Sequence, residues 1–299
     1  MDLTLMDATI EEFAAAVGSE GDVAIAGLGT RGGAVGDARR VVAPAGITRI
    51  DAAEMVVECG AATPMVELAA ALAEHGQTVA LPVSGTVGGA LAVGQSDITR
   101  LAYGPARDVL LQTHYVSAAG KATKAGGPTV KNVSGFDLCR LLVGAHGTLG
   151  FFGDVILRTR PIPRHTRWFT SDRDPMELLA ALYRPVSVLW NGTTTWVRLD
   201  GDARDVSAAA AAFDLADADG PPELPTAHRW SVAPSTLRDA LASSTGSFVA
   251  EIGVGIVHHT QPGPVKVPDG PTVALHERIK AQFDPTLRLN PGVELYARA

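Results

Sequence analysis

The sequence predicts an α+β protein built of two units. Three observations support this fold class. Helical and strand-like patterns alternate through the first half, and glycine-rich loops separate them. The sequence pattern then changes at Pro161-Ile162-Pro163, after which the predicted elements are shorter. We expect a first unit over residues 1–163, a smaller α+β unit over 164–262 and a C-terminal segment over 263–299.

In the first unit, hydrophobic period and end signals place the elements. Thr9 and Glu12 have capping-box spacing at the start of a helix over 9–17, and Thr63 is the expected N-cap of a helix over 64–75. Asp137 is expected to cap a short helix over 136–144 or to pair with Arg140. Strands are predicted at 22–27, 46–51, 54–60, 77–81, 108–118 and 151–159, and glycine-rich loops at 27–36 and 84–94.

The second unit shows shorter elements. An Asn191-Gly192 turn between two apolar runs predicts a hairpin over 186–199. A single strand is expected at 247–259, and residues 214–225 form a polar linker rich in Pro, Gly and Asp. Helices are predicted at 174–184, 203–213, 233–243 and, after a proline-rich loop, at 272–283.

Composition excludes several classes of protein. The chain has 299 residues, a net charge of −7 and no run of Lys/Arg longer than Arg39-Arg40, which argues against a nucleic-acid surface. Cys59 and Cys139 cannot build an iron–sulfur or zinc site alone, and no metal site is expected. The N-terminus lacks a signal-peptide layout and no apolar run reaches a membrane span of roughly 20 residues. We expect a cytoplasmic protein without a transmembrane segment.

The glycine-rich loops admit two interpretations. Residues 27–32 match G-x-G-x-x-G, and Asp51 follows at about the spacing of a ribose-binding acid, but NAD binding would require a helix over 33–43, where helical period is weak. One such loop alone would be interpreted as a tight surface turn. Because residues 84–94 and 126–152 are glycine-rich as well, three backbone segments can approach a large phosphate-bearing cofactor.

These loops carry a specific resemblance. "GLGTRGG", "GTVGGALAVGQSD" and "KNVSGFDLCRLLVGAHGTLGFF" recur in this order in flavoproteins of the vanillyl-alcohol oxidase type. The sequence is most similar to the FAD-binding subunits of bacterial glycolate oxidases, over about residues 20–163 and 272–296. The resemblance implies a two-lobed PCMH-type FAD-binding domain, a small α+β cap over 164–262 and a C-terminal segment that returns to the FAD-binding domain.

The resemblance also implies the cofactor site. Backbone amides of residues 27–33 would hold the pyrophosphate, Val155 would lie near the adenine and Asn290 near the isoalloxazine ring. FAD is expected to be non-covalent, because no His stands in "AGLGTRGG". The implied set is Gly27, Leu28, Gly29, Thr30, Arg31, Gly32, Gly33, Pro82, Ser84, Thr86, Gly88, Gly89, Lys131, Asn132, Gly147, Thr148, Gly150, Val155 and Asn290.

The sequence pattern that indicates a substrate site in such flavoproteins is incomplete in this chain. Catalytic relatives carry a pattern like H-x-G-D-G-N-x-H, whereas residues 251–258 read "EIGVGIVH", so that only His258 keeps a histidine position. His258 is the candidate catalytic base, with a packing histidine as an equal interpretation, and His259 should face the other way along a strand.

Three functions follow as expectations. The first is an FAD-dependent oxidoreductase subunit of glycolate oxidase type, working with a second flavoprotein and an iron–sulfur subunit in the oxidation of a small hydroxy acid. The second is a stand-alone FAD oxidoreductase that uses His258. The third is a scaffold subunit without flavin.

Overall fold

The computed structural model describes residues 3–31, 36–128, 137–264 and 268–293. The chain divides into two compact units. The first combines residues 1–97, 105–162 and 268–295, and the second combines residues 98–104, 163–267 and 296–299. Both contain helices and antiparallel sheet, so the predicted α+β class is confirmed.

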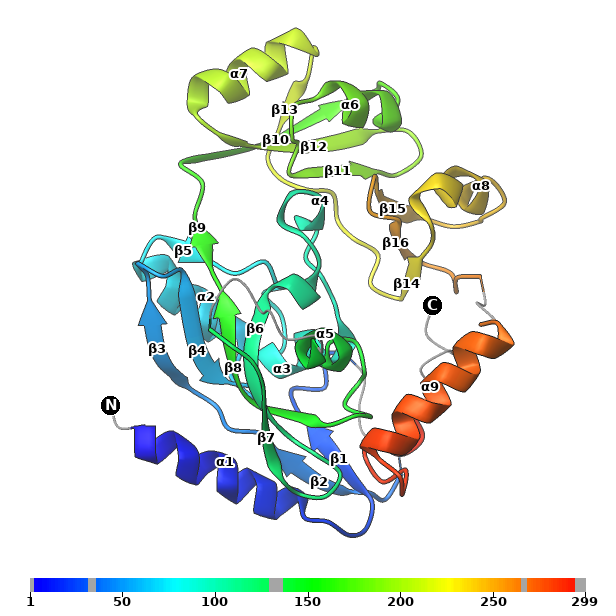
Figure 1. The fold of residues 1–299 in the computed structure, drawn as a ribbon. Helices are drawn as coiled ribbons and strands as arrows, with labels where there is room; N and C mark the ends of the chain where they lie inside the picture. Colours follow the sequence, from blue (N-terminus) through cyan, green and yellow to red (C-terminus); the bar gives the residue numbers. More distant parts are fainter. Residues whose placement is uncertain (1–2, 32–35, 129–136, 265–267, 294–299) are drawn as a thin grey trace. The chain divides into compact units, whose positions relative to one another are not determined.

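The first unit is built on a five-stranded antiparallel sheet (Figure 1). The central strand is almost wholly buried. Four of the five strands were expected, and 122–126 was not, since its polar Thr and Lys break the apolar pattern. The order is β3 (Ile47–Asp51), β4 (Val56–Gly60), β8 (Phe151–Arg158), β6 (Leu110–Val116) and β7 (Ala122–Gly126).

Two small strand pairs complete the unit. β1 (Val23–Ala26) pairs in parallel with β2 (Arg39–Val42), and β5 (Gln77–Thr78) pairs with β9 (Arg160–Pro161). The strand expected at 77–81 is therefore shorter. The NAD interpretation is wrong as well, because residues 39–42 are a strand where dinucleotide binding of Rossmann type needs a helix.

The helices of this unit correct three expectations. α1 (Leu3–Val17) begins before Thr9, so Thr9 is not its cap. α2 (Met65–Glu74) has Pro64 as N-cap, while the buried Thr63 hydroxyl accepts from the Gly46 amide at 2.9 Å. The third correction is α3 (Val87–Val93), which lies inside the stretch expected to be a loop. The remaining helices are η1 (Ala106–Asp108), α5 (Leu138–Leu142) and α9 (Gly270–Phe283).

Asp137 behaves as the capping residue that the sequence predicts. Its carboxylate accepts from the Arg140 amide at 3.1 Å and pairs with the Arg140 guanidinium at 3.2 Å. The side chain is exposed, so Asp137 is a cap on the surface. Its role in the described structure is local, at the start of α5.

The second unit carries a seven-stranded sheet. The expected hairpin at Asn191-Gly192 is confirmed, with Trp190 opposite Thr195. The single strand expected at 247–259 is wrong: it is two antiparallel strands joined by a turn at Gly253 and Gly255, both with positive φ. The sheet order is β13 (Ala216–Ala218), β10 (His165–Ser171), β12 (Thr195–Gly201), β11 (Ser187–Trp190), β15 (Phe248–Glu251), β16 (Ile256–His259) and β14 (His228–Ser231).

Apolar clusters on this sheet pack against helices. Phe169 and Val197 lie in one cluster with Leu178 of α6, and Val188 and Val257 lie in a second cluster with helix α8. The helices are α4 (Arg100–Tyr103), α6 (Pro175–Ala181), α7 (Ala203–Ala212), η2 (Pro234–Thr236) and α8 (Leu237–Ala242).

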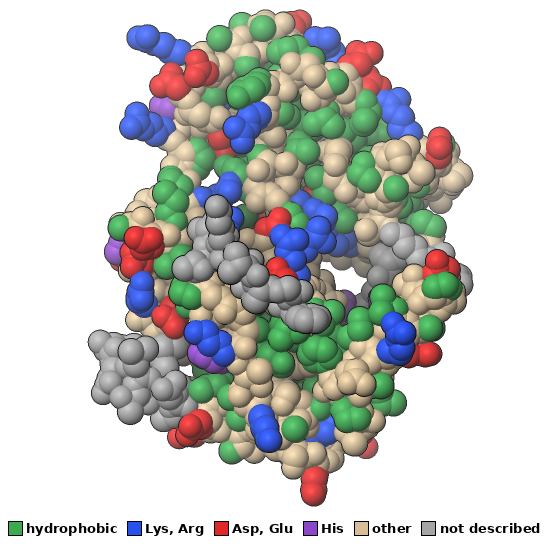
Figure 2. All heavy atoms as spheres, viewed as in Figure 1, with side chains coloured by type: hydrophobic (Ala, Val, Ile, Leu, Met, Phe, Trp, Pro, Cys, Tyr) green, Lys and Arg blue, Asp and Glu red, His purple; other side chains and the backbone are tan. Residues whose placement is uncertain are grey.

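The surface is mixed in charge. On the face that Figure 2 shows, basic and acidic side chains are interspersed. Within the described ranges, no helix combines the length and the apolar character that crossing a bilayer would require.

Candidate functional site

Asn290 joins three segments that are far apart in the sequence. Its Oδ1 accepts from the Ile25 amide of β1 at 2.9 Å, and its Nδ2 donates to the His146 carbonyl at 2.7 Å. Its own amide donates to the Val23 carbonyl at 2.9 Å. Asn290 is buried and has a φ of +47°, a conformation that Asn adopts more readily than most residues. The segment around Asn290 is thereby fixed beside β1 and the turn at 144–150.

Helix α3 connects that turn to the second glycine-rich loop. The Gly144 and His146 amides donate to the carbonyls of Leu91 and Ala92 at 3.0 and 2.8 Å. At its other end, the Thr86 hydroxyl caps the helix by accepting from the Gly89 amide at 3.1 Å. A methyl group in place of a hydrogen on Gly27 would lie 3.6 Å from the same hydroxyl. The three glycine-rich regions therefore meet in one place.

The glycines where these three regions meet fall into two groups. Gly88, Gly147 and Gly150 have no room for a side chain, because a Cβ would lie 2.9 Å from Ala61, 2.5 Å from Asn290 Nδ2 and 2.6 Å from the Tyr115 ring. Gly29 faces open space, and a Cβ on Gly27 would make only an ordinary contact with the Thr86 hydroxyl. The first group is needed for packing within the protein, and the second leaves an exposed stretch of backbone.

The exposed stretch has the features of an anion cradle. Within the described part of the chain, the Leu28 and Gly29 amides donate no hydrogen bond, and residues 27–30 are exposed. Gly29 has a φ of +69°, which turns the chain and displays consecutive amides. A phosphate group can approach such backbone without meeting side chains. This donor set fits the pyrophosphate of a dinucleotide.

Arg31 extends from this cradle to the second loop. Its Nε donates to Gln95 Oε1 at 2.6 Å and its Nη2 to Ser84 Oγ at 3.2 Å. The guanidinium lies over Gly85, where any Cβ would clash with Arg31 Nη1 and Thr30 Oγ1. Gln95 was not among the expected residues, because nothing in the local sequence links it to Arg31.

The other expected cofactor residues have varied environments. Thr148 is buried, with its hydroxyl donating to the Ala145 carbonyl at 2.7 Å. Pro82 is half-buried between β5 and α3, and Val155 is fully buried in the middle of the five-stranded sheet. The expected residues that lie outside the described ranges are Gly32, Gly33, Lys131 and Asn132.

Arg288 holds the tail that carries Asn290. Its guanidinium is buried and donates to backbone carbonyls at the end of α1, in the loop before β1 and in the turn between β6 and β7. Desolvation by that burial lowers the pKa of Arg288. The backbone amides of Arg288 and Leu289 donate to Asp284, which also pairs with Lys280 at 2.6 Å. No local pattern in the sequence indicates this role. The accepting carbonyls belong to Val17, Gly18, Glu20, Gly21 and Ala118.

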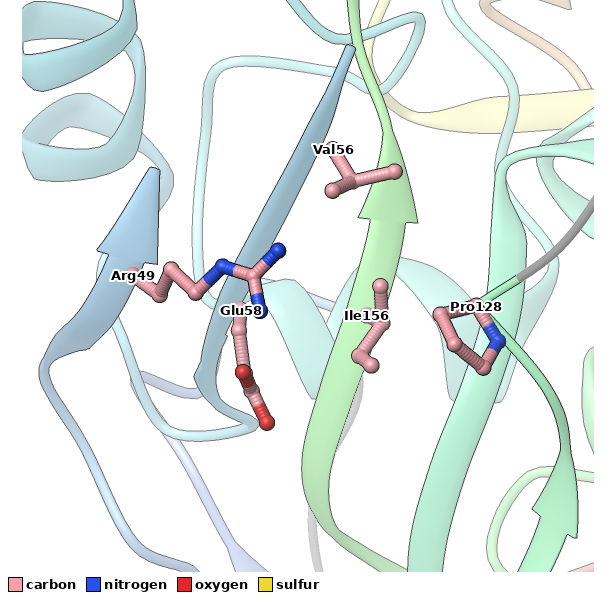
Figure 3. A pocket seen from close by; sticks show the side chains of 5 residues that line it. All are labelled: Arg49, Val56, Glu58, Pro128 and Ile156. Carbon is pink, nitrogen blue, oxygen red and sulfur yellow. The ribbon is translucent and has the colours of Figure 1, made fainter. Parts of the chain in front are cut away.

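A small pocket lies elsewhere, on the surface of the five-stranded sheet (Figure 3). Arg49, Glu58 and Ile156, from three neighbouring strands, line it with Val56 and Pro128. Its volume of about 30 Å³ holds about one water molecule, which is far too small for a flavin. None of the cradle residues lines it.

His258 of the second unit is paired with Glu251. Its Nε2 lies 2.9 Å from Glu251 Oε1, and both side chains are largely buried. The pairing results from the turn between β15 and β16, which the expectation of a single strand missed. Glu251 Oε2 has no hydrogen-bond partner among the described residues. A histidine held by a carboxylate can take up a proton, so the pair is chemically able to act as a base.

His259 is separate from this pair, as strand alternation predicts. Its ring stacks on Trp230 with centroids 4.1 Å apart, and it is fully buried. Desolvation lowers the pKa of His259, and the nearby His228 lowers it further. His259 is a packing residue.

Metal and thiol chemistry have little support in the described residues. Within the described ranges, no group of three or more His, Cys, Asp or Glu side chains is placed to hold a metal ion. Cys59 and Cys139 are both free and buried.

Comparison with known proteins gives matches to part of the chain. Residues 15–126 match the family described as FAD binding domain. Glycolate oxidase subunit GlcE of Escherichia coli is 33% identical over 176 residues, 55% of this chain and 50% of that protein. D-lactate dehydrogenase of Archaeoglobus fulgidus is 36% identical over 38% of this chain and 26% of its own length. Glycolate oxidase subunit GlcD of Bacillus subtilis is 37% identical over 26% and 17%. The chain thus spans half or less of these relatives.

Solved structures support the fold. Two crystal forms of alkyldihydroxyacetonephosphate synthase match with TM-scores of 0.66 and 0.67 at 11% identity. The matches cover 97% and 96% of this chain and 74% of the other in each case. At this identity the likeness concerns the fold alone, and it agrees with the expected PCMH-type arrangement.

Proposed function

We propose, from the match of residues 15–126 to the family of FAD binding domains, that this chain is an FAD-dependent oxidoreductase subunit of glycolate oxidase type. The observation that carries the proposal is the meeting of the loop after β1, the Thr86 cap of α3, the turn at 144–150 and Asn290. These are the regions in which the sequence resembles FAD-binding flavoproteins.

The residues divide into ligand-facing and supporting groups in this proposal. The amides of Leu28 and Gly29, with Thr30 beside them, hold the pyrophosphate of FAD, and Gly27 keeps the approach open. Gly88, Gly89, Gly147 and Gly150 allow the supporting elements to pack closely, and Asn290 fixes the tail against β1. The roles of Pro82, Ser84, Thr86, Thr148 and Val155 stay predictions from the resemblance.

Bound FAD would supply the two-electron redox chemistry. The chain itself positions the cofactor through backbone donors, which cost no rearrangement of side chains when the anion binds. No His is available in residues 27–31 for a covalent link, which supports non-covalent binding.

The proposed partners follow from composition and from the relatives. The two relatives named as glycolate oxidase subunits support membership of a complex. With two buried cysteines, this chain cannot supply the thiolates of an iron–sulfur cluster, so such a cluster would belong to another polypeptide. The substrate class of the complex is a small 2-hydroxy acid, and the location of this chain is cytoplasmic in this proposal.

The experiment is anaerobic titration of the FAD-loaded chain with glycolate and D-lactate. As a subunit, the chain keeps its flavin oxidised with these acids alone, and its flavin is reduced once a substrate-reduced flavoprotein subunit is added. Full reduction by the acid alone would contradict the subunit role.

The second candidate, a stand-alone hydroxy-acid oxidoreductase, is favoured by the His258–Glu251 pair. In that case the chain alone is reduced by substrate, and His258→Gln slows reduction by about 10²–10⁴-fold, the usual contribution of a general base. His228→Gln is the matched control, since His228 is an exposed histidine of the neighbouring strand. Equal slowing in both variants would exclude a specific role for His258.

A further inference from the structure

Lys280 connects helix α9 to the turn at 144–150. Its Nζ donates to the Thr148 carbonyl at 2.7 Å and pairs with Asp284, four residues further along the chain, at 2.6 Å. The Asp284 carboxylate is wholly buried, whereas the Lys280 side chain is 23% exposed. The ammonium group is therefore held by a buried counter-charge, and it links the helix to the backbone of the turn.

Asp284 fixes the place of this lysine. Its carboxylate also accepts from the Arg288 amide at 3.1 Å and from the Leu289 amide at 2.8 Å. The carboxylate cannot follow a movement of Lys280 without leaving these two buried amides unpaired, which is costly. Hydrogen bonds that involve an ionised group are also roughly twice as strong as neutral ones. The end of α9 and the segment that carries Asn290 thus form one connected network.

This network binds the turn through two of its carbonyls. Lys280 donates to the carbonyl of Thr148, and Asn290 donates to the carbonyl two positions earlier. The amides of Gly147 and Leu149, in contrast, donate to no acceptor within the described ranges, although both residues are buried. Buried backbone amides are nearly always paired. The network therefore occupies acceptors of the turn and leaves two of its donors available to a ligand.

We propose that Lys280 is a positioning residue for the cofactor: its ammonium group holds the turn at 144–150 in the form that binds FAD. This inference rests on the proposed function, in which the turn is part of the cofactor site, and it adds a residue that acts through the turn. Within the described structure α9 buries none of its residues, so that a contact such as that of Lys280 has a large share in fixing the helix.

The test measures FAD affinity of the full chain by quenching of flavin fluorescence, with urea unfolding on the same samples. Lys280→Met removes the donor and its charge, and it should weaken FAD binding by about 10- to 100-fold, the range for loss of a hydrogen bond from a charged group. Lys280→Arg keeps a charged donor and should restore most of the affinity. Arg278→Met is the matched control, because Arg278 is an exposed residue of the same helix and the change in net charge is the same. It should bind FAD like the wild type.

Amide hydrogen exchange distinguishes positioning from a merely structural role. Because coupling between two sites is reciprocal, bound FAD should slow exchange in residues 277–283 of α9 by up to the same factor in the wild type and in Arg278→Met, but not in Lys280→Met. Equal FAD affinity of Lys280→Met and Arg278→Met would overturn the inference. If Lys280→Met does not fold, wild-type exchange in α9 that FAD leaves unchanged would overturn it as well. Failure of the wild type to bind FAD at all would instead reject the proposed function.

Discussion

Asn290 gives the sharpest prediction about how the site is held together. Replacing it by Ala removes the acceptor of the Ile25 amide and the donor to the His146 carbonyl. Both hydrogen bonds are part-buried. A buried backbone group that loses its partner costs about 1–3 kcal/mol, so the loss of both bonds in Asn290→Ala should lower the free energy of unfolding by at most about 2–6 kcal/mol. For a unit of this size, that corresponds to a fall in Tm of about 2–4 °C for each kcal/mol.

The assay is urea unfolding followed by circular dichroism, with FAD affinity measured on the same samples. The free energy of unfolding of Asn290→Asp should lie between those of the wild type and Asn290→Ala. The Asp side chain keeps an acceptor for the Ile25 amide, but it places a carboxylate against the His146 carbonyl. Leu287→Ala is the control, because Leu287 lies in the same tail, is 61% exposed and shares a positive φ. An Asn290→Ala variant within about 0.5 kcal/mol of Leu287→Ala, the usual limit for surface changes, would refute the reasoning.

Three further outcomes are expected. Gly147→Ala should destabilise the wild type, because its Cβ would lie 2.5 Å from Asn290 Nδ2, and should cost less in the Asn290→Ala background; additive effects on urea unfolding would contradict the contact. Burial raises the pKa of the Cys59 thiol to about 12 and that of Cys139 to about 11, so iodoacetamide at about pH 8 should modify the unfolded but not the native chain, by mass spectrometry. The pKa of His259 is lower in the folded chain than in the unfolded chain, where it is about 6.5. As the pH falls through this value, the unfolded state therefore takes up a proton before the folded state does, and the free energy of unfolding declines. His259→Phe, which preserves stacking on Trp230, should flatten that decline; an unchanged pH profile of Tm would exclude His259 as its source.

Much of the fold could be predicted because local patterns agree with it. The alternation of buried and less buried residues in β4 and the apolar run of β8 identify these strands, and Asp137 shows the preference of a cap. The family resemblance then supplied the expected FAD site.

Other elements were missed for physical reasons. Glycines lower helix propensity, yet α3 forms because Val87, Ala90 and Leu91 bury one face at helical spacing and Thr86 caps it. The run 247–259 looks like one strand because its two halves are apolar, and only the positive φ of Gly253 and Gly255 makes it a hairpin.

The long-range contacts of the site were beyond any local pattern. Asn290 binds Ile25 across 265 positions, and Arg31 binds Gln95 across 64. A single sequence carries no signal for such pairs, because neither partner is unusual in its own segment. The same holds for Arg288 and its backbone acceptors.

The most direct test of FAD binding is the visible absorption spectrum of the purified chain incubated with FAD, taken before and after acid precipitation. We expect a flavin spectrum that remains with the native chain through gel filtration and leaves with the supernatant after acid. A chain that stays colourless after exposure to FAD would contradict the proposed cofactor and leave the fold as a scaffold without flavin.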